Sequence, residues 1–126
     1  MKIKKPTLKE LHNVWADCVK ARAGMKSEYS GKKKYLHAHH IHGKPNYRLR
    51  FELANGVCIT SGEHKFIAHN TWRSEEFKTW AVNLRSFPTQ TAKIYVRNHI
   101  KTDLVLLKKY LELKLREFQA VNRFSG

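Results

Sequence analysis

The sequence predicts a single α+β domain, in which two short strands and a helix lie between an N-terminal helix and a mostly helical C-terminal part. Three observations lead to this fold class. Apolar residues recur at helical spacing near both ends of the chain, two central segments are typical of strands, and 126 residues are enough for one modest core. We expect one domain over residues 1–126, with a central core at about 35–70 and a helical extension at about 74–120.

The first helix is expected to begin at Thr7. In the segment Thr7-Leu8-Lys9-Glu10, the threonine fits the N-cap and the glutamate fits the reciprocal position of a capping box. Leucine, tryptophan and valine then recur at helical spacing for about four turns, and Gly24 offers a stop. Residues 24–34, which are rich in glycine, serine and lysine, are expected to form a loop.

Two strands are expected next. Residues 35–41 form the first, and GVCIT, at residues 56–60, forms the second after an Asn-Gly turn or bulge. The segment HGKPNYRLR between them is expected to be a connecting loop. After the second strand, GEHKFIAHN is predicted to be a short helix.

The rest of the chain is expected to be helical. Ser74 fits an N-cap, since two acidic residues follow it in what would be the first turn. TQTAKIYVRNH is predicted to be a short helix, and Thr102-Asp103 opens the longest helix, which reaches about residue 120. The wide apolar face of that helix packs on the domain or, alternatively, pairs with a second copy of the chain to give a homodimer.

The net charge of the chain limits the classes of partner that it is expected to bind. The formal net charge of +15 favours a polyanion, of which nucleic acid is the stronger candidate and an anionic membrane the weaker. No apolar run is long enough to span a bilayer, and the N-terminus lacks the apolar stretch of a secretory signal. Two cysteines do not make a disulfide scaffold, so we expect a protein of the reducing cytoplasm. From the charge and the lack of an apolar span, we expect it to bind DNA and no membrane.

Histidines are concentrated in one segment. HAHHIH, at residues 37–42, holds four of the eight histidines, and Asn55 and His64 follow it. Imidazole binds transition-metal-like ions and titrates near neutral pH, so one residue type can both hold a metal and move a proton. Adjacent side chains of a strand point to opposite faces. His39 and His40 can therefore serve one site only if the strand ends or distorts there.

The segment HHIHGKPNYRLRFELANGV resembles the HNH endonucleases, most of all small phage proteins of the NinG type. The later segments IAHNT and FKTW and the Thr-Asp helix also resemble that group, so the likeness covers about residues 18–118. It implies a ββα-metal finger, which consists of two strands and a helix around one divalent ion. It also implies a bacteriophage protein that acts in the cytoplasm of a bacterial host.

The resemblance implies a metal-dependent DNA endonuclease that hydrolyses phosphodiester bonds with one Mg, Mn, Ni or Zn ion. His40 matches the general base, Asn55 the residue that orients it, and His39 and His64 the metal ligands. Cutting of one strand and of both strands are both left open. The alternatives are a nuclease of branched or recombining DNA and a non-catalytic DNA-binding protein that keeps the finger as a scaffold.

His69 is a further candidate ligand. It lies five residues after His64, which places the two side chains about 140° apart on a straight α-helix. We expect His69 to bind the metal only if the helix ends before it, and otherwise to contact the phosphate. His37 and His42 receive no role, and His12 and His99 are expected to be structural or exposed.

Relatives of this kind often carry a structural zinc site made of two Cys-x-x-Cys pairs around the finger. The pairs would fall at positions 18 and 21 and at positions 60 and 63, where this chain has cysteine only at Cys18. A closed zinc site needs about four ligands. We therefore expect no structural zinc, with packing by the first helix and Trp15 in its place.

Basic residues surround the proposed site in sequence and are candidates for contacts with the DNA backbone, because guanidinium groups match phosphate geometry. Arg48 and Arg50 are the strongest candidates, and a solvated loop is the alternative. Sequence specificity is expected to be low or to come from DNA shape. The full candidate set is Lys44, Arg48, Arg50, Lys65 and Arg73.

Overall fold

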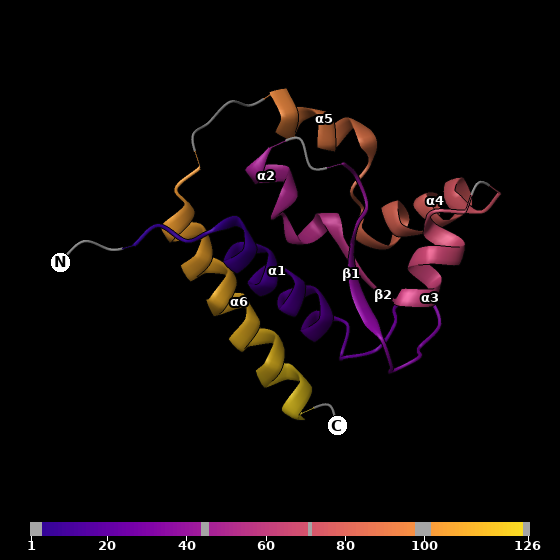
Figure 1. Cartoon of the computed structure of the whole chain (residues 1–126), viewed down its shortest axis with the longest axis horizontal. Coiled ribbons are helices and arrows are strands. Elements are labelled where there is room, and N and C mark those ends of the chain that lie inside the picture. The colour runs from indigo at the N-terminus through magenta and orange to yellow at the C-terminus, as the bar shows by residue number, and fades with distance from the viewer. Residues whose placement is uncertain (1–3, 44–45, 71, 98–101, 125–126) are drawn as a thin grey trace.

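A computed structural model of the chain describes residues 4–43, 46–70, 72–97 and 102–124. Helices surround a two-stranded sheet, so the predicted α+β class is confirmed (Figure 1). Lys44 and His99 lie outside the described residues. The elements are α1 (Leu8–Arg22), β1 (Leu36–His40), α2 (Tyr47–Arg50), η1 (Leu53–Asn55), β2 (Gly56–Thr60), α3 (Ser61–Glu63), η2 (His64–Ala68), α4 (Ser74–Arg85), α5 (Thr89–Arg97) and α6 (Leu104–Phe124).

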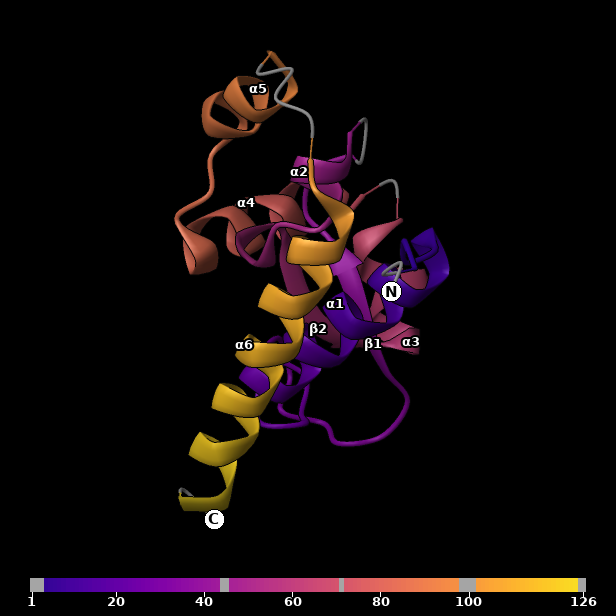
Figure 2. The same ribbon diagram turned by 90° about the vertical axis from the view of Figure 1, so that its left-hand side faces the viewer.

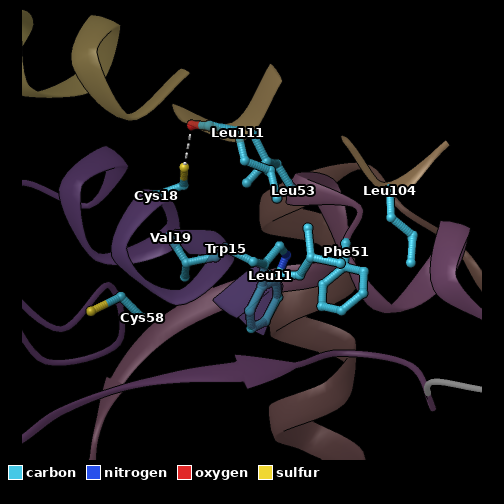
Figure 3. Packing of buried hydrophobic residues seen from close by; sticks show 9 residues of the cluster. All are labelled: Leu11, Trp15, Cys18, Val19, Phe51, Leu53, Cys58, Leu104 and Leu111. Atoms are coloured by element: carbon cyan, nitrogen blue, oxygen red, sulfur yellow. Dashed lines mark hydrogen bonds between the residues drawn. The ribbon is translucent and has the colours of Figure 1, made fainter. Parts of the chain in front are cut away.

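Helix α1 begins where its sequence predicts, with Thr7 as the N-cap, whereas the Glu10 carboxylate pairs with Lys108 of α6. The Thr7 side chain accepts a hydrogen bond of 3.1 Å from the Glu10 backbone N–H, which satisfies one of the unpaired donors of the first turn. One face of the helix is fully buried and forms the centre of the main core (Figure 3). That face consists of Leu11, Trp15, Cys18 and Val19.

Strands β1 and β2 are antiparallel, and His40 pairs with Gly56. The two faces of this sheet meet different helices, because successive side chains alternate between them. Ala38 and Cys58 face α1 and belong to the main core. Val57 and Ile59 face the other way and pack with residues of η2 and α4 in a second cluster. The sheet therefore separates two cores.

Gly56 is required by close packing. A Cβ atom at this position would lie 2.7 Å from Cζ2 of Trp15 and 2.6 Å from Cγ2 of Val19. Only glycine lets α1 approach the sheet this closely. The Asn-Gly pair thus ends η1 and begins β2, as predicted, but the glycine serves the approach of Trp15 to the sheet.

Helix α6 lies alongside α1 over most of its length (Figures 1 and 2). Cys18 Sγ donates to the Leu111 carbonyl at 3.1 Å (Figure 3), and Asn122 Nδ2 donates to the Ala21 carbonyl at 2.8 Å. The helix buries Leu104 and Leu111 against the core. On its outer side, large apolar side chains are exposed, among them Leu106, Tyr110 and Leu113.

Three local predictions were wrong. The expected loop after β1 contains the one-turn helix α2, because the Asn46 side chain accepts from the Leu49 N–H at 2.8 Å and caps a helical turn. Ser74 is the first residue of α4, and Arg73 precedes it without a side-chain cap. The predicted single helix after β2 consists of two segments, α3 and the π-helical turn η2.

Two arginines and one glutamate form a polar cluster at the edge of the main core, here called the arginine cluster (Arg22, Glu28 and Arg85). Glu28 forms an ion pair with Arg85 and accepts from the Cys58 N–H at 3.0 Å. Both arginines donate to the Gly56 carbonyl, at 2.6 Å from Arg22 and 3.0 Å from Arg85. Burial and the neighbouring Arg85 lower the pKa of Arg22 to about 10. The cluster ties α1 and α4 to the start of β2.

In the part of the chain that the structure describes, no helix combines the length and apolar character needed to cross a membrane.

Candidate metal and catalytic site

Both neighbouring histidines of β1 line one cavity of about 630 Å³. His39 lies on the sheet face toward η2 and α4, whereas His40 lies on the face toward α1. The strand ends at His40, as the sequence required for a shared site. Residues from both faces, among them His12 of α1 and Lys78 of α4, line the same cavity. The cavity therefore extends around the end of β1.

Three histidines come together on the α4 side of this cavity. The nearest ring nitrogens of His39, His64 and His69 all lie within 4.8 Å of one another, and these residues are here called the histidine cluster. Nε2 of His64 and Nε2 of His69 are 2.9 Å apart. Two nitrogens that bind one ion in a tetrahedral arrangement, each at the usual 2.0–2.1 Å, lie about 3.3 Å apart. The three residues could therefore hold a metal ion.

The short helix α3 places the first residue of η2. Thr60 and Glu63 form a complete capping box, with Thr60 Oγ1 accepting from the Glu63 N–H at 3.1 Å and Glu63 Oε1 accepting from the Thr60 N–H at 2.9 Å. Ser27 donates to the same carboxylate at 2.6 Å. Burial alone would raise the pKa of Glu63, but hydrogen bonds from Ser27, Ser30 and Thr60 outweigh it and lower that pKa. A buried carboxylate thus fixes the turn that precedes His64.

The π-helical turn explains how His64 and His69 meet. The sequence-based argument assumed an α-helix, in which residues five apart cannot share a face. In a π-helix the hydrogen bonds run from residue i to residue i+5, so residues five apart lie next to each other. Segment η2 begins at His64 and ends at Ala68, which leaves His69 at its C-cap. The helical segment thus ends before His69, which is the condition under which the sequence analysis expected His69 to bind the metal, whereas the assumption of a straight α-helix was wrong.

The surroundings of the histidine cluster favour neutral imidazoles. Burial, followed by the nearby His64, His69 and His40 side chains, lowers the pKa of His39 to about 3. Burial, His69 and His37 also lower the pKa of His64. Two of the three imidazoles are thus neutral near neutral pH, which is the form that binds a metal ion.

His40 is held by the backbone and by Trp15. Its Nε2 lies 2.8 Å from the Arg50 carbonyl oxygen. Because a carbonyl can only accept, Nε2 carries the hydrogen, and a neutral ring then has its lone pair on Nδ1. The indole of Trp15 stacks on the imidazole at 4.1 Å between centroids and 8° between planes. Trp15 is itself fixed by a 3.0 Å hydrogen bond from Nε1 to the Glu52 carbonyl.

Asn55 is fully buried and binds backbone groups at the end of β1 and in α2. Its Oδ1 accepts from the His42 N–H at 2.8 Å, and its Nδ2 donates to the Leu49 carbonyl at 3.1 Å. Its backbone carbonyl also accepts from the Ile41 N–H at 2.9 Å. Asn55 thus fixes the segment that follows His40 and the helix that contains Arg50. Any orienting effect of these bonds on His40 acts through the backbone.

Two other histidines near the site, His42 and His12, have different surroundings. His42 is buried, and its Nε2 lies 2.7 Å from the Phe87 carbonyl, so it joins the segment after β1 to the segment after α4. His12, which was expected to be structural or exposed, lies at the wall of the cavity with its ring centroid 6.1 Å from that of His40. His12 lies three residues before Trp15 on α1, which is the one signal in the sequence that could have found it.

The cavity wall also includes Glu75 and Lys78, two exposed residues of α4 that the sequence analysis did not propose. Lys78 belongs to the FKTW segment, but its position in the motif does not reveal where it points. Among the described residues of the predicted DNA-contact set, none lines the cavity. Arg48, Arg50 and Lys65 instead lie over aromatic rings, namely those of Tyr95, Phe51 and Phe66 at 4.8, 5.6 and 5.4 Å.

Comparisons with protein-family models, with curated proteins and with solved structures find no match to this chain. The relation to HNH endonucleases therefore stays a prediction that depends on the motif residues.

Proposed function

We propose that this protein is a metal-dependent DNA endonuclease of the HNH type. Strands β1 and β2 with the α3–η2 segment would form its ββα-metal finger. One observation carries the proposal: three imidazole nitrogens converge on one side of a cavity, and a fourth histidine, held in a defined tautomer, lines the same cavity. His39, His64 and His69 are the proposed metal ligands, and His40 is the proposed general base.

A divalent ion such as Mg, Mn, Ni or Zn would supply charge stabilisation for the phosphate oxygens in the transition state. The protein's part is to orient the base. The Arg50 carbonyl holds the proton on Nε2 of His40, so that Nδ1 accepts the proton of the attacking water. As His40 becomes positively charged, the face of Trp15 stabilises that charge by a cation–π interaction. The resemblance further implies 5′-phosphate and 3′-hydroxyl ends.

The proposed substrate follows from the charge. A net charge of +15 attracts a polyanion at long range. At the cavity itself, Lys78 is the proposed contact to a backbone phosphate. Arg48, Arg50, Lys65 and Arg73 stay candidates for contacts further along the DNA. Their cationic groups would contact the DNA backbone outside the cavity.

A supercoiled-plasmid assay with Mg or Mn tests the proposal. We expect metal-dependent nicking or linearisation by the wild type, and a loss of about 10²–10⁴-fold in rate for His40→Ala. His40→Gln, which retains some of the packing on Trp15, guards against a folding defect, and circular dichroism matches all variants. Unchanged cleavage by both His40 variants would contradict the proposed base.

The same assay separates the alternatives. If the wild type binds plasmid DNA and leaves it intact in every metal, a branched junction is the next substrate. Cleavage of the junction alone would identify a nuclease of recombining DNA. If the junction also stays intact, the endonuclease proposal is wrong and the protein acts by binding.

A further inference from the structure

His37 lies beside the histidine cluster but outside the set of ligands that the motif implies. In the register of the sheet, His37 pairs with Ile59 and His39 pairs with Val57, so the two histidines lie on the same face of β1. The ring centroid of His37 is 5.5 Å from that of His64, with 35° between the ring planes. His37 is exposed, whereas His39 is partly buried.

The number of imidazole ligands at the histidine cluster decides whether a bound zinc ion keeps an open coordination position. Zinc sites with three protein ligands keep a fourth position for water or substrate, whereas sites with four protein ligands are closed and structural. His39, His64 and His69 provide three. A fourth imidazole within reach would complete a tetrahedron and leave no position for a phosphate oxygen.

We propose that His37 is a fourth ligand for zinc at the histidine cluster, and that zinc bound in this way closes the site. The proposal rests on the metal site of the proposed function. An ion that prefers six ligands, such as Mn²⁺, keeps exchangeable positions even with several imidazoles bound. Zinc would therefore inhibit cleavage that manganese supports, and His37 would determine this difference.

The required movement is small. The proposal requires a change of side-chain rotamer that brings a ring nitrogen of His37 to the cluster, and exposed side chains change rotamer readily.

Cobalt and zinc binding to the metal-free full-length protein tests the proposal without any measurement of cleavage. Tetrahedral Co²⁺ absorbs visible light much more strongly than five- or six-coordinate Co²⁺. The wild type and His37→Ala should both give the intense spectrum, but added inorganic phosphate should change only that of His37→Ala, because a closed four-imidazole site leaves phosphate no position and a three-imidazole site leaves one. We also expect at least about tenfold weaker zinc binding by His37→Ala, because even outer-sphere partners of zinc ligands change affinity by about 10–100-fold.

Two controls make the outcomes distinct. Lys34→Ala changes an exposed residue just before β1 and should behave as the wild type, whereas His64→Ala should lose the tight site. Identical responses to phosphate and identical zinc affinities for the wild type and His37→Ala would overturn the role of His37 and leave the three-histidine site standing. Failure of the wild type to bind cobalt or zinc would overturn both this proposal and the proposed function.

An inhibition assay gives an independent readout. Zinc titrated into a cleavage reaction with Mn²⁺ should stop the wild type at a lower concentration than it stops His37→Ala. Equal inhibition of the two proteins would contradict a closing role for His37.

Discussion

The arginine cluster and the histidine cluster are both groups of polar side chains in the same small fold, but only the first contains its own counter-ion. Glu28 forms an ion pair with Arg85, and Arg22 and Arg85 share the carbonyl oxygen of Gly56. The histidine cluster instead consists of three groups of one kind, and the short contact between Nε2 of His64 and Nε2 of His69 joins two of them. The first cluster already contains an anion for its cations, and the second would gain most from a bound cation.

This difference predicts that the arginine cluster contributes to stability and the histidine cluster to metal binding. Removing a member of a complete cluster leaves a buried charge without its partner, which costs stability. Removing a histidine from the other cluster leaves no buried charge behind and therefore costs less stability, but it removes a metal ligand. Stability and metal binding should therefore respond to different residues.

The largest expected loss of stability is for Glu28→Gln. This change leaves Arg85 without its ion-pair partner and removes the carboxylate that favours the charged form of the neighbouring Arg22. We expect the free energy of unfolding to fall by about 3 kcal/mol, measured by urea denaturation. Glu10→Gln is the matched control, because it breaks the exposed Lys108–Glu10 pair and should change stability by less than about 1 kcal/mol. Equal effects of the two variants would show that the arginine cluster is not a structural element.

Metal binding should stabilise the wild type and not His64→Ala. At a free metal concentration of about 100 times the dissociation constant, we expect a gain of about 2.7 kcal/mol, seen as a higher melting temperature. His64→Ala, in which one ligand of the cluster is missing, should melt at the same temperature with and without metal. A metal-dependent shift of normal size in His64→Ala would place the ion elsewhere.

Acid should destabilise the metal-free protein through His39. Its pKa is about 3 in the folded protein, against an ordinary value of 6.5. Below about pH 6.5 the unfolded chain therefore binds a proton that the folded chain does not bind until about pH 3. The free energy of unfolding should fall as pH falls through this window, and it should fall less steeply in His39→Asn. Denaturation at about pH 7 and pH 5 measures both slopes, and parallel slopes would contradict a buried neutral His39.

The smallest expected effect is on oligomeric state. The sequence analysis left open that the apolar face of α6 pairs with a second copy of the chain. Leu106, Tyr110 and Leu113 are exposed on the outer side of the helix. Basic residues border this strip, so two copies would bring like charges together at low salt. We expect a monomer at low salt and weak dimerisation only at high salt, measured by sedimentation. A stable dimer at low salt would require a different packing.

The sequence determined the elements that depend on local chemistry. Thr7 caps α1, residues 36–40 and 56–60 form the strands, and the Leu-rich C-terminal segment forms one long helix. These features follow from capping, alternation and helical periodicity, which are properties of neighbouring residues. The concentration of histidines in β1 was likewise visible, and His39 and His64 do lie together.

The tertiary structure decided what the histidines contact. Whether His69 could join His64 depended on the winding of η2, which α-helical periodicity does not reveal. The partner of His40 is the backbone carbonyl of Arg50, and no residue identity encodes where a carbonyl points. His12 and Lys78 reach the cavity only because α1 and α4 pack on opposite faces of the sheet. Local sequence sets each element, whereas the site depends on distances between elements that only the packing of the two cores sets.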